Sequence, residues 1–260
     1  MKKKSILITN DDGFESIGLK ALVEALSEIA HITVVAPTTE KSACGHSLTL
    51  TKPLRFIEID DDFYKLDDGT PSDCVYLALN TIFMDKKPDL VISGINKGAN
   101  MGEDITYSGT AAGAMEAVLQ GVPAISISQV CRDKCQNINE DTFELAKYVI
   151  KDLVTKIFKS EFPLPERRFL NVNIPPTPLE LFQGYKITRA GYRLYANDAQ
   201  LHRNPRGEEY YWLGLHKLEW IASEDMYCDF EAVQQDYVSI TPIKLDLTSY
   251  NDLEKLKNWI

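Results

Sequence analysis

The sequence has no apolar run long enough to cross a bilayer, since a membrane-spanning helix needs about 20 consecutive apolar residues. A secretory leader is not expected either. Lysines stand at positions 2–4, but the apolar run that follows, Ser5–Thr9, is too short for the hydrophobic part of a signal peptide. We therefore expect a cytoplasmic protein that has no membrane partner.

Cysteines are few, and their odd number and irregular spacing do not suggest a disulfide framework. They stand at positions 44, 74, 131, 135 and 228. Three residues separate Cys131 from Cys135, which is not the usual spacing of a zinc or redox motif, and no second Cys/His pair lies nearby. We expect reduced thiols, several of them buried.

Basic residues are in deficit, because 28 Lys and Arg stand against 38 Asp and Glu, for a formal net charge of -10. A broad nucleic-acid-binding surface is not expected, since phosphate backbones are bound by clustered Lys and Arg. A small anionic substrate remains compatible with a locally positive site. No repeat or low-complexity segment interrupts the 260 residues, which suit one large α/β domain or two small ones.

The sequence does contain an alternation of short apolar runs and amphipathic segments. The runs predict strands at Ile6–Ile8, Ile32–Ala36, Leu90–Ser93 and Pro123–Ser128. Helices are predicted around the stripe Leu19, Leu22, Val23 and Leu26, and over Thr110–Gly121. This order predicts an α/β fold, a Rossmann-like three-layer αβα sandwich around a mostly parallel sheet. In such sheets, ligands bind beyond the carboxyl ends of the strands.

The second part of the chain is different. A long amphipathic helix is predicted over 140–158 and a strand over 169–175, whereas 186–220 is rich in Tyr, Arg and Trp. Asn204–Gly207 is a turn signal between two β-like runs, so we expect a long, protruding β-hairpin. Because an isolated hairpin is only marginally stable, it packs either on a partner subunit, which we favour, or back on its own domain.

Oxygen-bearing side chains follow three of the predicted strands. Asn10, Asp11 and Asp12 follow the first, Ser42 lies in the loop after the second, and the segment "GINKGANMGEDITYSGT" (94–110) follows the third. Carboxylate, amide and hydroxyl oxygens are the ligands that Mg²⁺ and Mn²⁺ prefer. We therefore expect a divalent cation at this edge, offsetting the repulsion between the adjacent aspartates.

Each of these features has a purely structural interpretation when it is taken alone. "NDDG" is a common turn, and Thr70 and Ser108 stand where helix caps are expected. Taken together they favour a functional site. The loop that contains Gly98 and Gly102 leads into a helix N-terminus, where backbone amides and the helix dipole attract anions. A phosphate site beside a divalent cation suits phosphate-ester hydrolysis.

The motifs resemble a known family. "ILITNDDGFESIGLKAL", "VVAPTTEKSACGHSLTL", "GTPSDCVYLAL", "PDLVISGINKGANMGEDITYSGTAAGAMEAVLQGVPAISIS" and "DYVSITPIKLDLT" are similar, in order, to the survival protein SurE family. The resemblance implies a single domain over 1–260. It divides into a Rossmann-like core (1–185) and a hairpin with a C-terminal segment (186–260) that takes part in oligomerisation. It also implies a homodimer or homotetramer.

The resemblance further implies a metal-dependent phosphatase that hydrolyses nucleoside monophosphates, a 5′-nucleotidase. Activities toward 3′-nucleotides and polyphosphate stay open. One divalent ion per subunit, Mg²⁺ or Mn²⁺, would be held by Asp11, Asp12, Ser42 and Asn96. The residues expected to bind the phosphate or substrate are Asn10, Asn96, Gly98, Ser108, Gly109 and Thr110.

Asp11 and Asp12 are the expected catalytic residues. We favour Asp11 as the group that orients or deprotonates the attacking water, and the alternative makes it a nucleophile that forms an aspartyl-phosphate. A second class of function is a nucleotide-sensing module without turnover. A third, a sugar-nucleotide binder resembling a glycosyltransferase, would require a longer chain with a second Rossmann unit.

Overall fold

A nine-stranded sheet forms the centre of the computed structural model, which describes residues 3–131, 135, 139–194, 199–213, 219–222 and 227–260. The strands are β1 (Ser5–Thr9), β2 (His31–Pro37), β3 (Arg55–Asp60), β4 (Phe63–Asp67), β5 (Leu90–Lys97), β6 (Ala124–Gln129), β7 (Arg168–Ile174), β8 (Tyr185–Ile187), β9 (Tyr192–Arg193), β10 (Ala199–Arg203), β11 (Glu209–Leu213), β12 (Trp220–Ile221) and β13 (Val238–Lys244). The α-helices are α1 (Ile17–Leu26), α2 (Pro71–Asn80), α3 (Gly109–Leu119), α4 (Glu144–Lys159), α5 (Asp229–Gln234) and α6 (Leu253–Lys257). Four 3-10 helices complete the described elements: η1 (Gly102–Thr106), η2 (Glu140–Phe143), η3 (Leu179–Leu181) and η4 (Tyr250–Asp252).

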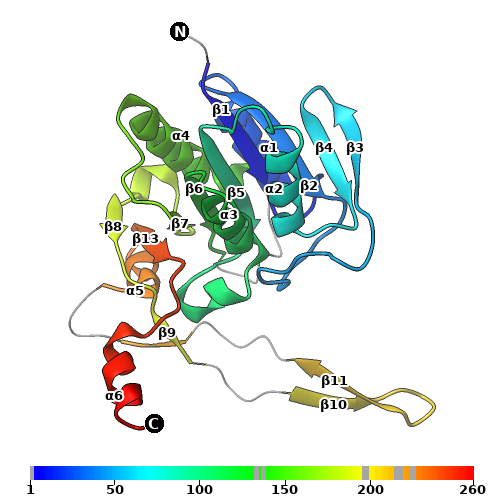
Figure 1. Cartoon of the computed structure of the whole chain (residues 1–260), viewed down its shortest axis with the longest axis vertical. Helices are drawn as coiled ribbons and strands as arrows, with labels where there is room; N and C mark the ends of the chain where they lie inside the picture. The colour runs from blue at the N-terminus through cyan, green and yellow to red at the C-terminus, as the bar shows by residue number, and fades with distance from the viewer. Residues whose placement is uncertain (1–2, 132–134, 136–138, 195–198, 214–218, 223–226) are drawn as a thin grey trace.

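The strand order is β3-β4-β2-β1-β5-β6-β7-β13-β8 (Figure 1). From β4 to β7 each neighbouring pair is parallel, while β3 and β13 run antiparallel to β4 and β7. The predicted mostly parallel sheet is therefore confirmed. The chain moves from β1 to β2 on one side and later returns to β5 on the other, so β1 and β5 flank a topological switch point, where ligands bind in such sheets.

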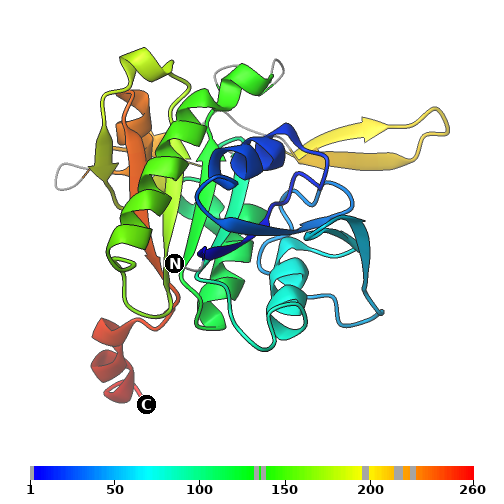
Figure 2. The same cartoon turned by 90° about the horizontal axis from the view of Figure 1, so that it is seen from above.

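Helices cover both faces of this sheet (Figure 2). Ile6 and Ile8 of β1 pack in the same cluster as apolar residues of α1 and α4, whereas Leu7 packs with those of α2 and α3. Successive residues of a strand point to opposite faces, so this one buried run supports two cores. Among the described residues, no helix combines the length and hydropathy that a membrane crossing needs.

Three helix starts follow from their sequence. Ser16, Thr70 and Ser108 each precede a helix, and each side chain accepts a hydrogen bond from the amide of the residue three positions later. Thr70 belongs to a capping box with Asp73, and Pro71 occupies the first helical turn. The predicted caps at Thr70 and Ser108 are therefore present.

The hairpin lies where the sequence predicts it, with a different extent. Strands β10 and β11 pair directly across the Asn204–Gly207 turn, and the pair projects from the body of the molecule (Figures 1 and 2). The alternative in which it folds back on its own domain is wrong, because every residue of both strands is exposed. Within the predicted 186–220 range, residues 195–198 and 214–218 lie outside the described part of the chain.

The hairpin's base is attached to the body. Strand β9 pairs with β12, the Arg193 side chain forms an ion pair with Asp104, and Trp220 stacks on Phe230 with ring centroids 5.1 Å apart. Strand β13 lies inside the main sheet between β7 and β8. The C-terminal segment therefore contributes to the core as well as to the projection.

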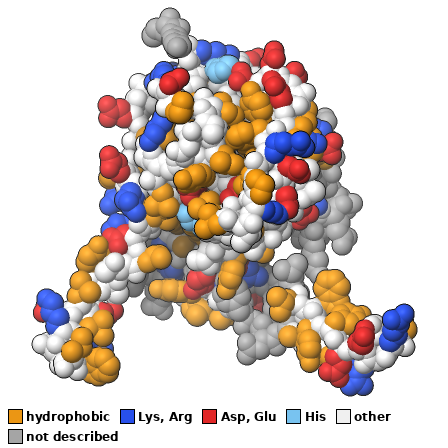
Figure 3. Space-filling model, turned by 45° about the vertical axis from the view of Figure 1, so that its right-hand side comes forward, with side chains coloured by type: hydrophobic (Ala, Val, Ile, Leu, Met, Phe, Trp, Pro, Cys, Tyr) orange, Lys and Arg blue, Asp and Glu red, His pale blue; other side chains and the backbone are white. Residues whose placement is uncertain are grey.

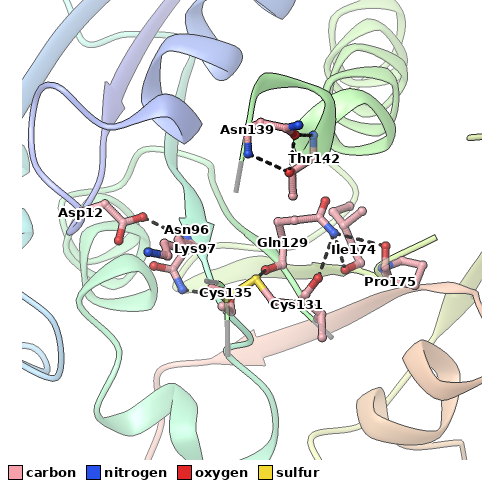
Figure 4. The surroundings of a disulfide bond; sticks show 12 residues. Asp12, Asn96, Lys97, Gln129, Cys131, Cys135, Asn139, Thr142, Ile174 and Pro175 are labelled. Atoms are coloured by element: carbon pink, nitrogen blue, oxygen red, sulfur yellow. Dashed lines mark hydrogen bonds between the residues drawn. A yellow bond between two sulfur atoms is a disulfide. The ribbon is translucent and has the colours of Figure 1, made fainter. Parts of the chain in front are cut away.

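The expectation of reduced cysteines is wrong for one pair. Cys131 and Cys135 form a disulfide (Figure 4), whereas Cys44, Cys74 and Cys228 are free, the last two buried. Cys135 has a positive φ of 56°, and the two Cα atoms lie 5.2 Å apart, within the range that a disulfide requires. The spacing of the two cysteines carries no signal of this pairing.

Candidate functional site

Three segments from different parts of the chain meet at the carboxyl edge of the sheet. Asp11 and Asp12 follow β1. The amide of Lys41 donates to the backbone oxygen of Asp11 (2.7 Å), and the amide of Lys97 donates to Oδ2 of Asp12 (2.9 Å). Asp12, Asn96 and Lys97 are seen together in Figure 4. The loops after β1 and β2 and the end of β5 are thus joined, as their places at the switch point predict.

Asp11 is buried and held by the start of α3. Oγ1 of Thr110 donates to Oδ1 of Asp11 at 2.5 Å. A Cβ atom added to Gly109 would lie 2.8 Å from Cβ of Asp11, so only glycine lets the helix come this close. Burial raises the pKa of Asp11 above its usual range, although the Thr110 hydrogen bonds act in the opposite direction. The Thr110 hydrogen bond orients the carboxylate, and burial leaves its ionised form without water to solvate it.

Asp12 is half-buried beside it. Burial raises its pKa to about 6, and the charge of Asp11 acts in the same direction. Two neighbouring carboxylates that are costly to ionise together form an arrangement that a bound cation stabilises. The raised pKa of Asp12 is consistent with the expectation from the sequence that a cation offsets the repulsion between the two aspartates.

Two side-chain amides lie near the aspartates: Asn96, a predicted ligand of the cation, and Asn10, a predicted substrate-binding residue. Nδ2 of Asn96 donates to the backbone oxygen of Gly98 (2.9 Å), so Oδ1 is the atom of this predicted ligand that could contact a cation. Nδ2 of Asn10 donates to Gly13 and Ser16, while Oδ1 of Asn10 is buried without a hydrogen-bond partner among the described residues. Carboxylate and amide oxygens suit Mg²⁺ or Mn²⁺.

Ser42 differs from the other predicted ligands because its side chain is turned toward Glu40. It is exposed, and its Oγ donates to Oε1 of Glu40 at 2.6 Å. The charge of Glu40 also raises the pKa of both Asp11 and Asp12, as a smaller contribution after burial. Sequence reasoning missed Glu40, since an exposed glutamate in a loop carries no distinguishing pattern. In the described part of the chain, no cluster of three or more His, Cys, Asp or Glu side chains is arranged to hold a metal, so the predicted site depends on its amide and hydroxyl donors.

The predicted phosphate-binding residues separate into two groups. Gly98 has a φ of +120°, but its amide already donates to the carbonyl of Gln129 (2.9 Å). This donor is therefore not directed at a phosphate, and Thr110 likewise uses its hydroxyl on Asp11. Two residues remain: Ser108 is the N-cap of α3, and Gly109, the first residue of the helix, lies directly beside Asp11.

Ser108 allows capping and phosphate binding to be separated. Its Oγ accepts from the amide of Ala111 (2.9 Å), and no described residue accepts its proton. A hydroxyl can donate and accept at once. We expect Ser108→Ala to lower stability by about 1 kcal/mol and to reduce kcat/KM by more than about tenfold. The measurement is steady-state kinetics on a nucleoside monophosphate beside a thermal melt.

Thr70→Ala is the matched control, because Thr70 caps α2 in the same way. It should lower the melting temperature and leave kcat/KM unchanged. If Ser108→Ala behaves like this control, Ser108 is a cap alone.

Comparison with known proteins agrees with this fold. A family model described as survival protein SurE matches residues 6–197. A curated relative from Nitratiruptor sp., named 5′-nucleotidase SurE, is 64% identical over 259 residues and covers 99% of this chain and 100% of its own length. A relative of the same name from Aliarcobacter butzleri is 65% identical, with 99% of both chains covered.

A solved structure is similar throughout. The SurE protein from Aquifex aeolicus is 45% identical, covers 98% of this chain and 99% of its own, and superposes with a TM-score of 0.84. The α/β sandwich and the resemblance expected from the motifs are confirmed, and the curated names are those of enzymes, specifically hydrolases. The chain belongs to the survival protein SurE family.

Proposed function

We propose that this chain is a metal-dependent phosphomonoesterase that hydrolyses nucleoside monophosphates to nucleoside and phosphate, a 5′-nucleotidase. The observation that carries the proposal is the pair Asp11 and Asp12 at the switch point, with raised pKa values and a helix N-terminus packed against Asp11. Full-length relatives named 5′-nucleotidase support it.

One divalent ion per subunit, Mg²⁺ or Mn²⁺, would be held by Asp11, Asp12, Asn96 and Ser42. When bound, such an ion supplies neutralisation of the phosphoryl oxygens and activation of water. Asp12 keeps its Oδ2 hydrogen bond to the amide of Lys97, which fixes the carboxylate at the end of β5. Ser42 would have to turn away from Glu40 to join this set.

The substrate phosphate would sit at the start of α3. Backbone amides in the first turn of a helix are unpaired within it, and the dipole favours an anion. Gly109 would contribute its amide and Ser108 its hydroxyl, since the Ser108 amide donates to the carbonyl of Ile105, and Thr110 orients the neighbouring carboxylate. Asn10, Asn96 and Gly98 complete the proposed substrate side, with Gly98 shaping the loop rather than donating from its amide.

Asp11 is the proposed proton acceptor. Burial raises its pKa, which favours taking a proton from the attacking water, and Thr110 holds one oxygen while Oδ2 faces Gly109. In the alternative, a carboxylate oxygen of Asp11 attacks phosphorus, the ester P–O bond breaks and the nucleoside leaves as its alcohol; water then hydrolyses the aspartyl-phosphate to phosphate and free Asp11. Rapid acid quench with labelled substrate separates the two, because only the second leaves label on the protein.

The test is release of phosphate from AMP, GMP and CMP with Mn²⁺ or Mg²⁺, repeated with a chelator. We expect turnover with metal and its loss on chelation, restored by added Mn²⁺. Binding of nucleotide without phosphate release would instead favour a sensing module. The same assay with a 3′-nucleotide or a polyphosphate as substrate tests whether the protein also hydrolyses these compounds. We further propose a homodimer or homotetramer in the cytoplasm, without nucleic-acid or membrane partners.

A further inference from the structure

A buried network of amides and hydroxyls surrounds one residue of the loop after β5. Oδ1 of Asn173 accepts from the backbone amide of Asn100 (2.9 Å), and Nδ2 of Asn173 donates to the backbone oxygen of Asn100 (3.0 Å). One side chain of β7 therefore holds both backbone groups of a residue in another segment, as a neighbouring strand would. Asn100 and Asn173 are both buried.

Further side chains support this clamp. Nδ2 of Asn171 donates to the same backbone oxygen of Asn100 (2.8 Å), and the Asn171 side chain is itself held by Ser126 (2.7 Å). Nδ2 of Asn100 donates to Oγ of Ser128 (2.8 Å). Buried polar groups are costly without partners, and here they satisfy one another, so the position of Asn100 is closely determined.

The clamp is connected to Asn96 through Gly98. The amide of Gly98 donates to Gln129 (2.9 Å), and its oxygen accepts from Nδ2 of Asn96 (2.9 Å). The direction of the Gly98 carbonyl therefore sets which way the Asn96 amide turns. That direction is fixed on one side by Gln129 and on the other by Asn100, two residues later.

We propose that Asn173 is a positioning residue: by clamping the backbone of Asn100, it sets the Gly98 carbonyl and so aims Oδ1 of Asn96 at the cation. The inference rests on the proposed metal site. It assigns a role in that site to a strand that supplies none of the predicted ligands. Partners that orient a metal ligand commonly affect metal affinity when they are removed.

The experiment measures Mn²⁺ binding by calorimetry and the Mn²⁺-induced rise in melting temperature, in wild type and Asn173→Ala. We expect binding about tenfold weaker in the variant, with kcat at saturating Mn²⁺ within about threefold of wild type. Ser239→Ala is the matched control, since Ser239 is the register partner of Asn173 on β13 and its buried Oγ has no partner among the described residues. It should leave Mn²⁺ binding unchanged.

Unchanged Mn²⁺ affinity in Asn173→Ala, with only a lower melting temperature, overturns the inference and leaves the proposed function standing. Failure of wild type to bind Mn²⁺ overturns the proposed function and this inference together. If Asn173→Ala does not fold, Ser128→Ala tests the same network by removing the partner of the Asn100 side chain. A weaker Mn²⁺ affinity there supports the inference, and an unchanged affinity refutes it.

Discussion

Asp12→Asn is expected to remove most of the phosphatase activity while making the metal-free protein more stable at neutral pH. The substitution keeps the shape and an oxygen that can accept from the amide of Lys97, but removes the charge. We expect kcat/KM to fall at least about 100-fold at saturating Mn²⁺, on the order of 3 kcal/mol of transition-state stabilisation. Steady-state kinetics across a Mn²⁺ titration provide the measurement.

The gain in stability follows from the raised pKa of Asp12, from 3.8 to about 6 in the folded protein. The folded state then binds the proton more tightly than the unfolded state, so stability falls as pH rises from about 4 to about 6, and the penalty persists above. It is on the order of 2–3 kcal/mol. The metal-free variant should melt higher than wild type at pH 7.5, and the difference should vanish near pH 4.

Asp89→Asn is the matched control, because Asp89 accepts from the Ser5 amide at the opposite end of β1 (2.9 Å) and is far from the switch point in the sheet register. It should not gain stability and should keep wild-type kinetics. Near-normal turnover by Asp12→Asn would remove Asp12 from the ligand set.

Replacing the hairpin strands, Ala199–Leu213, with a short flexible linker is expected to lower the oligomeric state. Its two faces both carry apolar groups: Leu201 pairs with Tyr211 on one, and Trp212 lies on the other. Leu213 is 85% and Trp212 64% exposed. Hydrophobic side chains are visible on the surface of the projecting hairpin (Figure 3). A two-stranded hairpin with apolar side chains exposed on both faces needs another surface to bury them. We propose that a partner subunit supplies this surface, in line with the expected homo-oligomer.

Sedimentation velocity at several concentrations measures the change. The deletion leaves Arg193 and Trp220, which attach the hairpin's base to the body, so the core should stay folded. Arg206→Ser, at the exposed turn, is the control and should not change the mass. An unchanged mass in the deletion variant would show that the hairpin is not the interface.

Local patterns predict most of the central fold. Each apolar run predicted as a strand between 6 and 128 becomes one, because apolar runs bounded by turn residues have few alternatives in a parallel sheet. Strand β5 is longer than predicted, reaching Lys97. A register shift between Ser93 and Asn96, with Gly94 at a φ of +140°, lets the ladder continue past a glycine that suggests a loop.

Long-range arrangements are less visible in sequence. The antiparallel β13 comes from residues far along the chain, and its place between β7 and β8 depends on topology rather than on its own pattern. At the site, the strand ends predict Asp11 and Asp12, whereas Asn96 is implied by the family resemblance. The contacts that orient them, from Thr110, Gln129 and Asn100, join segments whose residue types alone carry no signal of the pairing.

The absence of a side chain at Gly109 sets how closely the start of α3 approaches Asp11. With 2.8 Å between a would-be Cβ and Cβ of Asp11, an alanine here has to push the helix and the carboxylate apart. The helix start could retreat only by stretching the Thr110 hydrogen bond. A homologous chain with a larger residue at this point must therefore have a wider gap and a differently held acid, so this single residue type marks whether another sequence can build the same geometry.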